Sequence, residues 1–97
     1  MWRNDWREKL SEYRQGIDEI DSKVLELLGK RMELSGKIGE IKVERGLPVC
    51  VPEREEEVVR KRQEWGDSYG FRQRFVRVLL KVIMHESKRR QRELAVA

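Results

Sequence analysis

The chain has 97 residues, of which 41% are charged and 38% hydrophobic, and its formal net charge is +4. A chain of this length is expected to form one domain with a modest core, and we predict a single domain over residues 1–97. The charge excess is smaller than that of a typical nucleic-acid-binding protein, although it suits an anionic ligand.

The single cysteine, Cys50, cannot form an intrachain disulfide and favours a reducing compartment. No apolar run approaches the roughly 20 residues that cross a bilayer, and residues 1–6 lack the hydrophobic stretch of a signal peptide. We therefore predict a cytoplasmic protein that does not engage a membrane. The sequence contains one histidine, His85, and one cysteine. These are too few of the usual zinc ligands, so we expect no zinc site.

A long first helix is predicted over about residues 6–44. Its apolar residues recur every three or four positions, which is typical of one helical stripe: Leu10, Tyr13, Ile17, Ile20, Val24, Leu27, Leu28, Leu34, Ile38 and Ile41. Gly46 is suited to the position just after a helix end, so residues 45–51 are predicted to form a loop.

The length of this helix predicts a dimer. At 1.5 Å per residue, about 39 residues span roughly 58 Å, whereas a compact domain of this size has a radius of gyration near 13 Å. Two shorter helices cannot cover the apolar stripe of such a rod. A second copy of the same helix is the simplest partner, so we expect a homodimer.

Two further helices are predicted in the second half. Pro52 suits the first position of a helix over about residues 52–65, residues 66–70 form a turn, and a third helix covers about residues 71–94. The third helix carries an apolar stripe of Phe75, Val78, Leu79, Val82, Ile83 and Leu94. No segment alternates with a period of two residues, so we predict an all-α fold.

Basic side chains interrupt the stripe of the first helix. Arg31 and Lys42 are eleven residues apart, which is almost three turns, so they project the same way about 16 Å apart. Two interpretations are open: the two side chains bracket a small anion, or they extend along the stripe edge into solvent. Arg14 lies roughly 25 Å from Arg31 along the helix, so it does not join the same site within one chain. It is either an ordinary surface charge or a residue that an antiparallel partner helix brings to that site.

Polar residues also interrupt the stripe of the third helix. Ser87 and Gln91 form an i, i+4 pair where apolar residues are expected. They either bind a buried ligand or mark a helix end that emerges into solvent. Arg54 and Glu55 in the first turn of the second helix are either site residues or ordinary surface charges.

Several of these residues fit one family pattern. The segment from Arg14 to Asp21 resembles the R-x-x-I-D-x-I-D opening of the all-helical, AroQ-class chorismate mutases. Arg31, Lys42, the segment Pro52-Glu53-Arg54-Glu55 and the pair Ser87 and Gln91 follow in the same order as in that family. The resemblance covers about residues 8–94.

The resemblance implies a three-helix subunit in an intertwined homodimer that rearranges chorismate to prephenate without a cofactor or metal. It implies that Arg31, Arg54 and the partner chain's Arg14 bind the substrate, whose carboxylates suit arginine. It assigns Lys42 and Gln91 to the ether oxygen, and Glu55 to the ring hydroxyl. Ser87 is also expected in the site, and a shikimate-pathway enzyme is a candidate partner.

One residue departs from the family pattern. Val51 stands where family members often carry an aspartate, three residues before Arg54, so recognition of the hydroxyl region is altered. Three alternatives stay open: an isochorismate-pyruvate lyase of the same fold, a regulatory module beside another shikimate-pathway enzyme, and a basic helical nucleic-acid-binding dimer. The last would bind through exposed basic residues such as those of the run 88–92.

Overall fold

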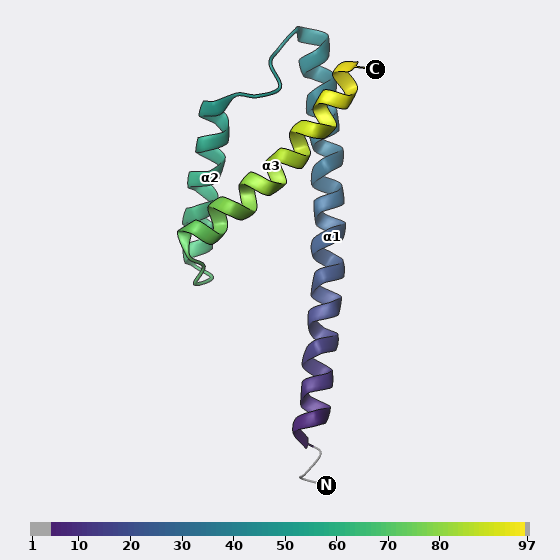
Figure 1. Ribbon diagram of the computed structural model, residues 1–97, viewed down its shortest axis with the longest axis vertical. Coiled ribbons are helices and arrows are strands. Elements are labelled where there is room, and N and C mark those ends of the chain that lie inside the picture. The colour runs from purple at the N-terminus through teal and green to yellow at the C-terminus, as the bar shows by residue number, and fades with distance from the viewer. Residues whose placement is uncertain (1–4, 97) are drawn as a thin grey trace. The chain divides into compact units, whose positions relative to one another are not determined.

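The computed structural model describes residues 5–96 and is 88% helical (Figure 1). It contains the helices α1 (Asp5–Arg45), α2 (Pro52–Asp67) and α3 (Gln73–Val96), and no strand occurs between residues 5 and 96. The all-α, three-helix prediction is therefore confirmed. None of these helices is long and apolar enough to span a bilayer.

A boundary between Arg31 and Met32 separates two compact units. The predicted single domain over 1–97 stays a prediction, and residues 1–4 and 97, which it includes, lie outside the described residues.

The first unit consists of the helical residues 5–31. Ion pairs between residues four positions apart, Lys9 with Asp5 and Lys30 with Glu26, lie on its surface and contribute little stability. Its apolar stripe is exposed in the single chain, and the following side chains are each 47–67% accessible: Tyr13, Ile17, Ile20, Val24 and Leu27. This unit on its own therefore does not bury the apolar face that its sequence provides.

The second unit has its core between α2 and α3. Five side chains form one buried cluster, in which Val59 is fully inaccessible: Val58, Val59, Val76, Leu80 and Met84. The three members from α3 are spaced by four residues, so they share one face of that helix. The C-terminal part of α1 adds the buried residues Met32, Ser35 and Gly39.

The end of α1 follows the expectation from its sequence. Gly46 has a positive φ of 65°, a conformation that costs a glycine little. The N–H of Leu47 donates to the carbonyl of Lys42 at 2.8 Å, which closes the last turn in the way typical of a glycine-terminated helix. The loop that follows is thereby turned back toward the end of α1.

The junction of α2 and α3 differs from the predicted turn at residues 66–70. Helix α2 continues to Asp67, and α3 begins at Gln73. Gly66 is buried in the last turn of α2, where a Cβ atom would lie 2.7 Å from Cγ2 of Val76. Gly66 is thus a packing residue that lets α3 approach α2.

Candidate functional site

Lys42 lies in the last turn of α1 and is half-buried. Its Nζ donates to the carbonyl oxygen of Val49 at 2.9 Å and to Oε1 of Gln91 at 3.0 Å. An ammonium group has three N–H donors, and these two bonds use two of them. The third is the one with which Lys42 can bind a ligand.

Gln91 is buried on α3, with 7% of its surface accessible. Because an ammonium group only donates, the carbonyl oxygen of the amide must face Lys42, and Nε2 is left as the donor end. Helix α1 approaches closely here, since a Cβ atom on Gly39 would lie 3.1 Å from Cα and Cγ of Gln91. The absent side chain at Gly39 therefore sets the position of Gln91.

Ser87 is buried one turn before Gln91. It accepts a hydrogen bond from Oγ of Ser35 on α1 at 3.0 Å, and its own hydroxyl lies 3.6 Å from Sδ of Met32. Ser35 was absent from the predicted site. One feature of the sequence points to Ser35 as a site residue: it lies on the helical face between Arg31 and Lys42, where an apolar residue is expected.

Glu55 is half-buried in the first turn of α2. Its Oε1 accepts from Nζ of Lys88 at 2.9 Å, and its Oε2 accepts from Sγ of Cys50 at 3.1 Å. The hydrogen bond from Lys88, followed by that from Cys50, lowers the pKa of Glu55. The same contact with Glu55 raises the pKa of the Cys50 thiol.

The remaining predicted residues are more exposed or belong to the other unit. Arg54 lies on the surface and donates to Glu57 at 2.8 Å. Val51 precedes α2 in an extended conformation and is half-buried. Arg14, which is exposed, and Arg31, which is half-buried, belong to the first unit.

The site residues of the second unit meet at one turn of α3. Ser87 contacts α1, Lys88 contacts Glu55 of α2, and Gln91 contacts Lys42. On this turn Gln91 bonds Lys42, and Lys88, three residues earlier, bonds Glu55. The predicted donors and the predicted carboxylate are therefore connected through one turn of α3. The combination offers cationic and neutral donors beside one ionised acceptor.

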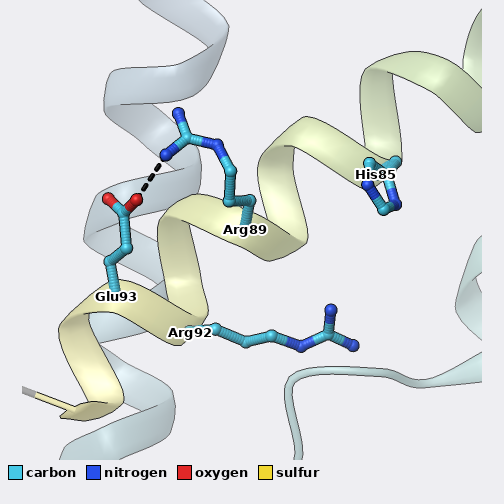
Figure 2. A pocket seen from close by; sticks show the side chains of 4 residues that line it. All are labelled: His85, Arg89, Arg92 and Glu93. Atoms are coloured by element: carbon cyan, nitrogen blue, oxygen red, sulfur yellow. Dashed lines mark hydrogen bonds and ion pairs between the residues drawn. The ribbon is translucent and has the colours of Figure 1, made fainter.

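A second candidate is a surface cleft of about 410 Å³ on α3 (Figure 2). It is lined by His85, Arg89, Arg92 and Glu93. The guanidinium of Arg89 bonds the carboxylates of Glu86 and Glu93, so its charge is already compensated. The cleft contains none of the predicted site residues, and the site around Lys42 is the stronger candidate.

The basic run at residues 88–92 is also largely engaged within the chain. Lys88 pairs with Glu55, Arg89 with Glu86 and Glu93, and Arg90 with Glu86. These pairs reduce the field that the run would present to a polyanion, which disfavours the nucleic-acid-binding interpretation.

Comparisons with known proteins place the chain in one family. A family model described as chorismate mutase type II matches residues 13–92. A bifunctional chorismate mutase/prephenate dehydratase from Aquifex aeolicus is 50% identical over 54 residues, which are 56% of this chain and 15% of that protein. The T-protein of Enterobacter agglomerans is 37% identical over 79 residues, which are 81% of this chain and 21% of that protein.

Two shorter relatives extend the comparison. A chorismate mutase from Methanocaldococcus jannaschii is 44% identical over 48 residues, which are 50% of this chain and 48% of that protein. A solved structure titled as a conserved hypothetical protein from Pyrococcus furiosus has a TM-score of 0.70 and 36% identity, and the match covers 86% of this chain and 95% of that one. The matches thus span about half or less of each curated relative.

The close approach at Gly39 predicts that Gly39→Ala disturbs Gln91. The new methyl group meets backbone and side chain of Gln91 at 3.1 Å, so we expect the free energy of unfolding to fall by about 1–3 kcal/mol. The NMR signals of the Gln91 side-chain amide should shift as its bond to Lys42 is strained.

Gly29→Ala is the matched control, because a Cβ atom there meets nothing within 4 Å. It should raise helix stability by up to about 1 kcal/mol and leave the Gln91 amide signals in place. Equal stabilisation by both alanines would show that α3 does not depend on the missing side chain at Gly39.

Proposed function

Because this chain belongs to the chorismate mutase type II family, we propose that it catalyses the rearrangement of chorismate to prephenate in phenylalanine and tyrosine biosynthesis. The observation that carries the proposal is the bond between Lys42 and Gln91, which sets two donors side by side on α1 and α3. The runner-up function on the same fold, an isochorismate-pyruvate lyase, is distinguished by the product.

The proposed mechanism relies on orientation and electrostatics. The reaction is unimolecular, and the breaking C–O bond leaves partial negative charge on the ether oxygen. The third N–H of Lys42 and the Nε2 donors of Gln91 stabilise this charge, and their bond to each other holds them in place before the substrate arrives. Such preorganised donors favour the transition state over the ground state.

The carboxylates of chorismate are assigned to arginines, whose planar forks bind carboxylates through two hydrogen bonds. Arg54 is available for this role, because its i, i+3 pair with Glu57 is exposed and such pairs are weak. Arg31 supplies a second group. Ser87 binds the substrate from α3, and Glu55 accepts from its ring hydroxyl beside Val51.

We also propose that the protein is an intertwined homodimer in which Arg14 acts on the site of the partner chain. The exposed apolar stripe of residues 13–27 supports this, because monomeric proteins rarely expose large continuous apolar patches. In this proposal a second copy of the chain buries that stripe and contributes the guanidinium of its Arg14.

A link to a prephenate-consuming enzyme is part of the proposal. The name of the Aquifex aeolicus relative joins a chorismate mutase to a prephenate dehydratase, which supports a functional connection between the two steps. The cytoplasmic location stays a prediction from the single cysteine.

Chorismate mixed with the purified protein, without added cofactor, should give prephenate at catalytic turnover as identified by NMR. Lys42→Ala should then lose about 10²–10³ in turnover number, because it removes one donor to the developing oxyanion. The fold should survive, as measured by circular dichroism.

Lys37→Ala is the matched control for Lys42→Ala, since Lys37 is an exposed lysine of the same helix. Its turnover should stay near that of the native protein. Pyruvate release from isochorismate without prephenate formation from chorismate would assign the protein to the lyases instead.

Mixing two inactive variants tests whether Arg14 acts across a dimer. In a mixed dimer of Arg14→Ala and Lys42→Ala chains, one site carries both changes and the other carries neither. Unfolding the two variants together and refolding the mixture should therefore restore about a quarter of native activity by random pairing. Each variant refolded alone is the control, and absence of recovery in a mixture shown to be dimeric by sedimentation would contradict action across the dimer.

A further inference from the structure

The ion pair of Lys88 with Glu55 is less exposed than seven further ion pairs on the three helices. Its side chains are 24% and 19% accessible, whereas those of the other pairs are 40–65% accessible. Lys88 follows the buried Met84 by one turn and precedes the buried Gln91 by three residues, so its aliphatic stem lies on the inner face of α3.

Glu55 is held from three directions. Its backbone N–H donates to the carbonyl of Val51 at 3.1 Å, which fixes it in the first turn of α2. Lys88 bonds one carboxylate oxygen and the Cys50 thiol bonds the other. Each carboxylate oxygen has a second lone pair for a further donor, so the arrangement orients Glu55 without blocking it.

We propose that Lys88 is a positioning residue for Glu55, which it holds as an ionised, acceptor-only group that selects a substrate presenting a hydroxyl donor. This inference rests on the proposed function, in which Glu55 meets the ring hydroxyl. Lys88 acts through Glu55 and does not itself contact the substrate. Cys50 completes the arrangement from the loop.

The arrangement has a consequence for pH dependence. The charged and titratable groups that act on Glu55 are Lys88 and Lys81 from α3 and Cys50 from the loop, and Arg92 acts on Cys50. The hydrogen bond from Lys88 is the largest cause of the lowered pKa of Glu55. Removing Lys88 raises that pKa toward its ordinary value, so activity that needs the carboxylate is lost at a higher pH during acidification.

Lys88→Met tests this directly, because methionine keeps most of the stem and removes the charge. At pH 7.5 Glu55 stays ionised, so a loss there reports its position, and we expect kcat/KM to fall roughly tenfold. The acid limb of the kcat/KM profile should move to higher pH. Lys88→Arg should recover most of both effects. Lys81→Met removes a nearby charge that acts on Glu55 only through space, so it should leave kcat/KM at pH 7.5 near native and move the acid limb much less than Lys88→Met does.

A double-mutant cycle separates positioning from direct substrate contact. In a Glu55→Gln background, Lys88→Met should reduce kcat/KM by less than about twofold, because its effect passes through the carboxylate. A further tenfold loss in that background would overturn the proposal. Should Lys88→Met fail to fold, Lys88→Gln takes its place in the same cycle.

A ¹³C NMR titration of the Glu55 carboxyl needs no turnover. The pKa of Glu55 should be higher in Lys88→Met than in the native protein, with Lys81→Met close to native. An unchanged pKa in Lys88→Met would overturn the inference. If the native protein converts no chorismate while this titration shows the expected change, the proposed function fails and the coupling of Lys88 to Glu55 stands.

Discussion

The arrangement of the candidate site depends on the two hydrogen bonds of the Lys42 ammonium. One goes to the loop at Val49 and the other to α3 at Gln91, so a single group joins three segments. Both bonds require local features of the chain. Gly46 ends α1 and turns the loop back, and the missing side chain at Gly39 admits α3. A polar tether of this kind fixes the geometry of the site while its third donor stays available.

In the last turns of α3, the helical spacing of the side chains determines which neighbouring helix each of them contacts. Ser87 and Gln91 are four residues apart and face α1, while Lys88 is one position further round and reaches α2. The arginines between them face outward and pair with Glu86 and Glu93. The residues of the run 88–92 therefore lie in three different environments: against α1, against α2 and on the outer surface. Most of its basic side chains form ion pairs with carboxylates of the same chain.

Helical periodicity and family resemblance were sufficient to predict the helices, the end of α1 at Gly46 and the helical faces of Lys42 and Gln91. They did not predict that Lys88 meets Glu55. The two residues are 33 positions apart, and in the sequence each one looks like an ordinary surface charge. The sequence predicts a turn over residues 66–70, whereas Gly66 lies in the last turn of α2. Its real role depends on Val76, which only the packing of α3 on α2 reveals.

The charge of the acceptor distinguishes the two lysines of the site better than exposure does. Both Lys42 and Lys88 are half-buried, but Lys88 donates to a carboxylate and Lys42 donates to a neutral carbonyl and a neutral amide. Lys88 and Glu55 thus form a locally neutral pair, whereas the charge of Lys42 is solvated by dipoles and is not cancelled. In a partly desolvated site a cation without a paired anion attracts developing negative charge strongly. The neutral acceptors of Lys42 therefore suit it to binding the ligand, whereas the carboxylate acceptor of Lys88 suits Lys88 to positioning Glu55.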